Sequence, residues 1–163
     1  MRKTSLVLAS VVSAISCNLL PPANAQRGGA PPSPVSASLT FKQGEIFGEC
    51  AFPFQLDQNG KAGTITLPGD RFILTAPKLH ATLTNINDPA KSVVLNIMGT
   101  THQSTDVSGT TTTVITGRNL AGDSDAGFVL VIGSFSFKFD AAGNLVQPLA
   151  GTGQLIKVCP LIS

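Results

Sequence analysis

The sequence contains no Trp and no Tyr, although it contains nine Phe. Sugar-binding faces generally stack a sugar ring on an aromatic side chain whose polar tip can stay in water. Trp and Tyr have such a tip, and Phe has none. The absence of both residues therefore argues against a carbohydrate-binding domain.

Charged residues of either sign are also scarce, at 12% of the chain. Arg2 and Lys3 stand at the extreme N-terminus, and without them nine basic residues balance nine acidic ones. A chain that is close to neutral offers no basic stripe to a phosphate backbone or an anionic membrane surface. We therefore expect no nucleic-acid partner.

Only one long hydrophobic run is present, from Leu6 to Leu20. It follows a cationic start and precedes the small-residue motif Ala23-Asn24-Ala25, and these are the three parts of a secretory signal peptide. The sequence thus predicts a signal peptide over residues 1–25, cleaved after Ala25, and a secreted or periplasmic protein. The run is shorter than the roughly 20 apolar residues that span a bilayer, and no second run follows. We expect no transmembrane segment in the mature chain.

Lipid anchoring at Cys17 is an alternative to this cleavage. Ser16-Cys17 follows the apolar run and loosely resembles the lipobox of bacterial lipoproteins, in which the cysteine is acylated. Ala14 stands where such motifs usually carry leucine, whereas the Ala-Asn-Ala site is well formed. Both routes take the chain out of the cytoplasm.

Cysteine is rare, and cleavage of the predicted signal peptide leaves only Cys50 and Cys159. In an oxidising compartment, two such cysteines favour one disulfide that joins the beginning of the folded region to its end. The alternatives are a catalytic thiol and a metal ligand. Neither cysteine belongs to a C-x-x-C motif or lies near a histidine in the sequence. We expect no cofactor.

The chain after residue 25 divides into two parts. Residues 26–37 (QRGGAPPSPVSA) are rich in Gly and Pro, which predicts a disordered arm. Over residues 38–163, β-branched residues and Phe alternate with polar ones between short clusters of Gly, Asn, Asp and Pro, which predicts strands and turns. We expect one all-β domain of about eight mainly antiparallel strands, a hairpin meander arranged as a β-sandwich or a partly closed barrel. The alternation fixes faces and leaves the strand order open.

Short polar clusters mark the expected turns. Asn59-Gly60 suits turn positions that need positive φ, and Pro68-Gly69 fits a type II turn. Similar clusters divide the remaining strand-like runs at Asn87-Asp88-Pro89, Ser108-Gly109 and Gly143-Asn144.

The segment FVLVIGSFSFKFD is the most informative about the core. Its first five residues are all apolar, which is typical of a strand covered on both faces. After Gly133 the pattern alternates, so that Phe135, Phe137 and Phe139 share one face. A glycine at this switch predicts a bulge or bend. We expect the three Phe in the core, and an apolar cavity lined by them is the alternative.

His80 and His102 are the two histidines of the chain. Each lies on the opposite face from the apolar residues of its segment, so we expect both to be exposed. If residues 92–102 form one strand paired with the strand of His80, the two imidazoles lie roughly 13 Å apart. That separation is too large for one metal ion or one proton relay.

Two stretches resemble small exported bacterial β-domain proteins that are uncharacterised. These stretches are TLTNINDPAKSVVLNIMGT and TGRNLAGDSDAGFVLVIGSFSFKFDAAGNLVQPLAGTGQ together with the cysteine that follows. The resemblance covers roughly Cys50 to Ile162. It implies export, a single β domain and paired cysteines, and it supplies no activity, cofactor or site residue.

The sequence predicts a non-catalytic exported protein that acts by surface contact or by binding a small ligand. One alternative is a hydrolase or lyase that uses His80 or His102 with a nearby Asp. Another is a lipocalin-like carrier that holds an apolar ligand among Phe135, Phe137 and Phe139. The partner is thus expected to be a protein or a small apolar ligand.

Overall fold

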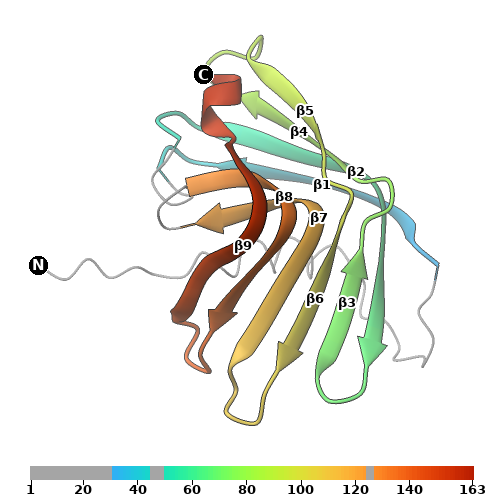
Figure 1. Ribbon diagram of the computed structural model, residues 1–163. Helices are drawn as coiled ribbons and strands as arrows, with labels where there is room; N and C mark the ends of the chain where they lie inside the picture. Colours follow the sequence, from blue (N-terminus) through green and yellow to red (C-terminus); the bar gives the residue numbers. More distant parts are fainter. Residues whose placement is uncertain (1–30, 45–49, 124–126) are drawn as a thin grey trace, which may run out of the picture.

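The computed structural model describes residues 31–44, 50–123 and 127–163, which form an all-β fold (Figure 1). The predicted signal peptide, its cleavage site after Ala25 and Cys17 lie outside the described residues. No helix in the described ranges is long and apolar enough to cross a membrane. The elements are β1 (Ser33–Phe41), β2 (Phe54–Leu67), β3 (Arg71–Thr75), β4 (His80–Asn85), β5 (Ser92–Asn96), β6 (Gly99–Thr105), β7 (Thr111–Asp123), β8 (Gly127–Phe139), β9 (Leu145–Lys157) and the 3-10 helix η1 (Cys159–Ile162).

The nine strands pair antiparallel in one sheet that is not closed into a barrel. The order is β5-β4-β2-β3-β6-β7-β8-β9, and β1 pairs with β2. Strand β2 belongs to two layers, because its first residues, Phe54–Asn59, pair with β1 and β4, whereas Gly63–Leu67 pair with β3. We call β1, Phe54–Asn59, β4 and β5 the first layer. Gly63–Leu67, β3 and β6 to β9 form the second layer.

The second layer bends along a row of glycines. Gly99, Gly117, Gly133 and Gly153 are direct cross-strand neighbours on β6, β7, β8 and β9. Gly133 and Gly153 both have a φ of 141°, a conformation that other residues rarely adopt. A Cβ atom on Gly153 would collide with the carbonyl oxygen of Ile132. Because of this bend, the last residues of β7 and the first residues of β8 lie beneath the first layer (Figure 1).

The first core lies between the two layers. Leu83 of β4 is completely buried, and Leu130 of β8 is 1% exposed in the same cluster. Phe54 stacks on Phe41 and on Phe128, with ring centroids 5.0 and 5.7 Å apart. Full burial of such side chains stabilises a fold by about 1.5–3 kcal/mol each, so these contacts hold the layers together.

Strand β8 separates the first core from a second one. Its residues Phe128 to Val131 are at most 3% exposed, which confirms the prediction of a strand covered on both faces. The second core contains Ile115 of β7 together with Phe135 and Phe137 of β8. The bend predicted at Gly133 is present.

The Cys50–Cys159 disulfide is present, as predicted, with Cα atoms 5.3 Å apart. Cys159 begins η1, whose Ile162 is completely buried against the first layer. The side-chain amide of Asn85 donates a hydrogen bond to the carbonyl oxygen of Ile162 at 3.1 Å. The C-terminal turn is therefore joined to the segment before β2 by the disulfide, and it is held against β4 by packing and by a buried hydrogen bond.

The prediction of an all-β, antiparallel fold is confirmed, and the described residues form nine strands, where about eight were expected. Strand β1 begins at Ser33, inside the segment 26–37 for which the sequence predicts a disordered arm. Its backbone pairs with β2 from Ser33 opposite Ala62 onward. The composition of residues 33–37 favours disorder, but pairing with β2 gives their backbone N–H and C=O groups hydrogen-bond partners.

One predicted turn is wrong. Asn59-Gly60 lies inside β2, where Gly60 has a φ of 149° and a Cβ atom would collide with the carbonyl oxygen of Lys78. The strand passes through this point from the first layer to the second. The turns predicted at Pro68-Gly69, Ser108-Gly109 and Gly143-Asn144 are present and connect β2 to β3, β6 to β7 and β8 to β9.

Candidate functional site

The two histidines lie in unrelated surroundings. His80 stands on β4 between Asn59 and Asn96, and His102 stands on β6 between apolar residues of β3 and β7. Both are exposed, and neither imidazole forms a hydrogen bond with another described residue. Within the described ranges, no group of three or more His, Cys, Asp and Glu could hold a metal ion. Neither imidazole therefore has the hydrogen-bonded partner that usually orients a general base.

The expected single strand over residues 92–102 is interrupted at Ile97-Met98. Strand β5 ends at Asn96 and pairs with β4 in the first layer, whereas β6 begins at Gly99 and pairs with β3 and β7 in the second. The chain crosses between layers here because Ile97 is buried in the first core. His102 consequently lies in the second layer and His80 in the first.

Phe135, Phe137 and Phe139 of β8 share one face, as predicted. Phe135 and Phe137 are buried in the second core with Ile115, and Phe139 packs against that core. The rings of Phe137 and Phe139 meet edge to face with centroids 5.7 Å apart. Their packing is that of core side chains.

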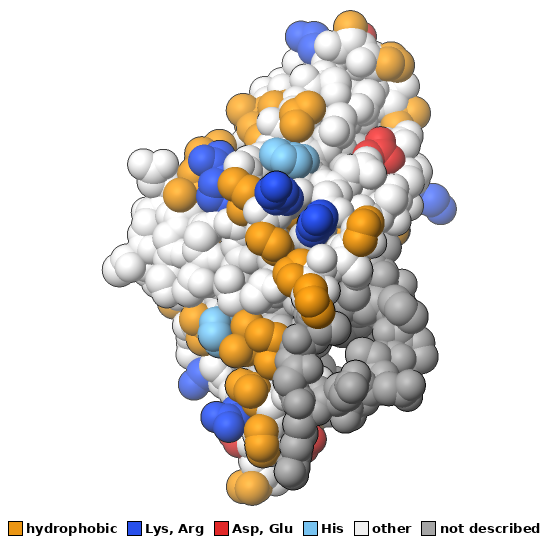
Figure 2. Space-filling view, turned by 90° about the vertical axis from the view of Figure 1, so that its right-hand side faces the viewer, with side chains coloured by type: hydrophobic (Ala, Val, Ile, Leu, Met, Phe, Trp, Pro, Cys, Tyr) orange, Lys and Arg blue, Asp and Glu red, His pale blue; other side chains and the backbone are white. Residues whose placement is uncertain are grey.

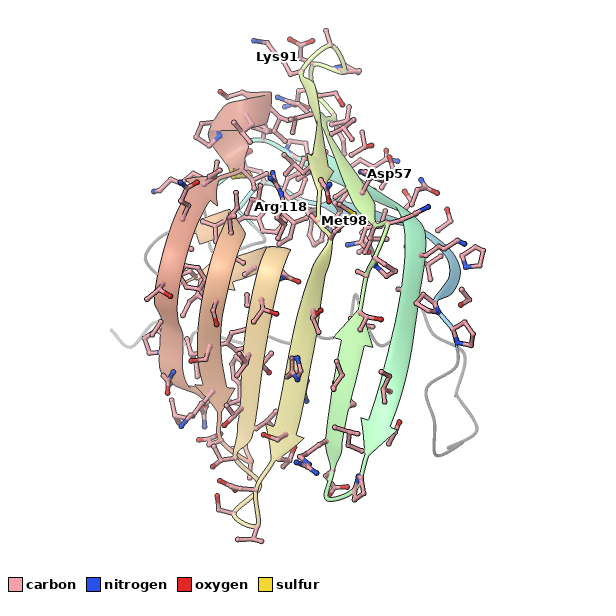
Figure 3. The ribbon with its side chains drawn as sticks, turned by 45° about the vertical axis from the view of Figure 1, so that its right-hand side comes forward. Asp57, Lys91, Met98 and Arg118 are labelled. Carbon is pink, nitrogen blue, oxygen red and sulfur yellow. A yellow bond between two sulfur atoms is a disulfide. The ribbon has the colours of Figure 1, made fainter. Side chains whose placement is uncertain are left out.

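The opposite face of the second layer is open and mainly polar, and we call it the polar face. Strands β3 and β6 to β9 lie side by side in Figure 3, with no described element crossing in front of them. None of its residues is buried. On β3 and β6 to β9 they form three rows across the strands: Arg71, Ser104, Thr112, Lys138 and Gln147; Ile73, His102, Val114, Ser136 and Ala150; and Thr75, Thr100, Thr116, Ser134 and Thr152. On β2 the same three rows begin with the apolar Leu67 and Ile65 and with Gly63.

The last of these rows consists entirely of Thr and Ser on β3 and β6 to β9, and we call this part the hydroxyl row. Neighbouring strands lie about 4.8 Å apart, so the row places hydroxyl groups at that interval across five strands. Thr75 donates a hydrogen bond to the carbonyl oxygen of Gly63 at 3.4 Å. The hydroxyl groups of the other four residues form no hydrogen bond within the described part of the chain. These residues are Thr100, Thr116, Ser134 and Thr152.

A groove of about 260 Å³ opens at one end of the hydroxyl row. Thr75, Thr100 and Thr116 line one part of it, and Ala76, Pro77 and Met98 supply apolar walls. It forms where the connections from β3 to β4 and from β5 to β6 pass between the two layers (Figure 3). No charged side chain lines the groove, so it offers hydroxyls beside apolar surface.

Arg118 fixes one wall of the groove. Its guanidinium Nε donates to the carbonyl oxygen of Asn96 at 3.1 Å, and its backbone N–H donates to the carbonyl oxygen of Met98 at 3.4 Å. Met98 and Arg118 lie close together at the junction of the layers in Figure 3. These bonds hold the β5–β6 connection in place, with the Met98 side chain 41% exposed.

Two aspartates at the far end of the second layer have perturbed acidity. The Ser108 hydroxyl and the backbone N–H of Thr110 donate to Asp106 and lower the pKa of its carboxyl. The side-chain amide and the backbone N–H of Asn144 lower the pKa of Asp140 in the same way. Each carboxylate closes its own hairpin turn, so these shifts have a structural explanation.

On the side of the molecule where β2 and β3 lie, the described hydrophobic side chains are exposed at several separate places. Figure 2 shows exposed hydrophobic side chains in small groups, with Lys and Arg side chains dispersed among them. Val94, on β5, is 66% exposed in the described part of the chain. Singly exposed apolar side chains of this kind are common on soluble domains.

The sequence alone does not reveal the hydroxyl row or the groove. Alternation places Thr100, Thr116 and Ser134 on one face of their strands, but only the register brings them side by side. The sequence does contain one indication of the hydroxyl row, which is the high threonine content of β6 and β7.

Comparison with known proteins adds no family: no family model, no curated protein and no solved structure matches this chain.

Proposed function

We propose that this protein is a non-catalytic binding protein that acts outside the cytoplasm and that its ligand-binding surface is the polar face with its groove. The Cys50–Cys159 disulfide supports an oxidising compartment, since such bonds persist mainly outside the cytoplasm. The isolated positions of His80 and His102 favour binding over catalysis.

The observation that carries this proposal is the hydroxyl row ending in an uncharged groove. Hydroxyls can donate and accept, and a typical hydrogen bond contributes about 0.5–1.5 kcal/mol, so several are needed for useful affinity. A row across five strands supplies them in one line. The matching ligand is uncharged and extended, with polar groups along its length and an apolar part that lies against Met98 and Pro77.

The proposal is tested by NMR titration of the labelled protein with two uncharged compounds, maltohexaose and octyl glucoside. Maltohexaose presents hydroxyls only, and octyl glucoside adds an alkyl chain. We expect octyl glucoside below its micelle concentration to shift the amide signals of Thr100, Thr116 and Met98, because the groove offers both kinds of surface.

The Thr100→Val and Thr116→Val double variant removes the hydroxyls with little change of shape and should abolish these shifts. Thr82→Val, which changes a partly exposed threonine of the first layer, is the matched control and should leave them unchanged. Shifts centred on Phe135 and Phe137 would instead favour the carrier of apolar ligands. No shift with either compound would contradict the proposed surface.

A further inference from the structure

Strand β9 forms one margin of the sheet, and its outer edge has no described partner. It is the last strand in the sheet order and pairs only with β8. The strand runs from Leu145 to Lys157, longer than β5 at the other end of the order, and lies along the margin of the second layer in Figure 1. An unpaired edge presents backbone N–H and C=O groups that can add a further strand.

The second half of β9 lacks the features that usually protect such an edge. Natural edge strands are blocked by proline, by irregular pairing or by charged side chains. Pro148 and the register shifts opposite Ser136 and Lys138 block the first half. From Leu149 onward the only charge is Lys157, and the pairing with β8 is regular from Ala150.

We propose that this edge pairs with β9 of a second copy of the chain, antiparallel and centred on Gly153. This inference is independent of the ligand-binding role proposed above. A two-fold axis through Gly153, perpendicular to the sheet, exchanges the parts of β9 on either side of the glycine row. Both copies then bend along the same line, so the bend does not oppose their pairing. An interface of this symmetry closes on itself as a dimer.

The side chains in this register are complementary. Leu155, which is 43% exposed, lies opposite Gly151 of the second copy. Gly151 is itself the cross-strand neighbour of Phe135, and with no side chain of its own it leaves room for a leucine beside that ring. Burial of the leucine removes apolar surface from water in both copies.

The remaining pairs also match in polarity. Thr152 lies opposite Gln154 of the second copy, and Ala150 lies opposite Ile156. Lys157 lies opposite Leu149, so no two like charges face each other across the interface.

The first test is the mass of the purified protein in solution, measured by sedimentation velocity over a concentration series. The expected result is a reversible dimer. Leu155→Lys places two charges in the new contact and should give a folded monomer, with the circular dichroism spectrum of the wild type. Val146→Lys is the matched control, because Val146 is 55% exposed on the same strand but lies outside the paired segment. It should remain dimeric.

The second test addresses the register. The variant with Thr152→Lys and Gln154→Lys places like charges directly opposite one another and should dissociate. The variant with Thr152→Glu and Gln154→Lys places opposite charges there and should restore the dimer, more weakly at high salt. A monomeric wild type, a dimeric Leu155→Lys protein, or assemblies that keep growing with concentration would each overturn the proposal. Growing assemblies would indicate pairing of β9 with a different edge.

Discussion

Cys50 and Cys159 are 109 positions apart in the sequence, and their Cα atoms are 5.3 Å apart in the folded chain. Both are buried in the first core, where the bond joins the segment before β2 to the turn after β9. The disulfide thus links the two ends of the domain at the place where the layers pack.

Removal of this bond by Cys50→Ala together with Cys159→Ala should lower the free energy of unfolding by about 2–5 kcal/mol, because the unfolded chain regains the entropy of a long loop. Urea unfolding of the oxidised wild type and the variant measures the difference. Wild type treated with a reductant should unfold near the variant. Coincident curves for all three proteins would mean that the bond adds no stability.

Gly153→Ala should destabilise the fold more than Gly143→Ala. Both glycines have positive φ, so each alanine introduces backbone strain of about 1 kcal/mol or more. A Cβ atom at Gly153 also collides with the backbone of Ile132, whereas nothing lies within 4 Å of one at Gly143. Thermal unfolding of the two variants gives the comparison, and equal losses would show that the close approach at the bend can relax.

Acid should weaken the two hairpin turns closed by Asp106 and Asp140. The hydrogen bonds from Ser108 and Asn144 lower the pKa of each carboxyl below the value of about 3.9 for an unfolded Asp. The stabilisation is therefore complete above that pH and is lost as the pH falls through the folded pKa.

The variant with Asp106→Asn and Asp140→Asn should be less stable than wild type at pH 7 and should lose less stability on acidification. Urea midpoints between pH 7 and acidic pH measure both effects. Asp70→Asn removes an exposed carboxylate that forms no hydrogen bond within the described residues, and it serves as the control. Parallel pH profiles of the double variant and the wild type would contradict this assignment.

Leu83→Ala should lower the free energy of unfolding by about 2–5 kcal/mol, because it opens a cavity between the layers. Leu161→Ala removes the same atoms from a side chain that is 43% exposed and should change stability far less. Chemical denaturation distinguishes the two. A small effect at Leu83 would mean that the first core repacks around the lost side chain.

Strand β8 could be predicted from the sequence because its information is local. The apolar run before Gly133 and the alternation after it record which faces are covered, whatever the neighbouring strands are. Cysteine usage was equally informative about the disulfide, since only Cys50 and Cys159 remain after the predicted leader.

The predictions that failed rest on local sequence patterns that are compatible with more than one conformation. Asn59-Gly60 permits a hairpin turn, but Gly60 serves here as the bend at which β2 leaves one layer for the other. Likewise, the alternation of Val93, Leu95 and Ile97 gives no sign that the chain changes layer at Met98. The hydroxyl row depends on register across five strands, which short-range patterns do not specify.

The hairpins β6–β7 and β8–β9 have a consequence for the order of assembly. Each is closed by a short turn that an aspartate holds in shape, so its strands can meet early and with little loss of chain entropy. The sulfur atoms of Cys50 and Cys159 take their final positions only when the first layer has packed on the second. We therefore expect oxidation to come late and to lock an arrangement that the hairpins have already established.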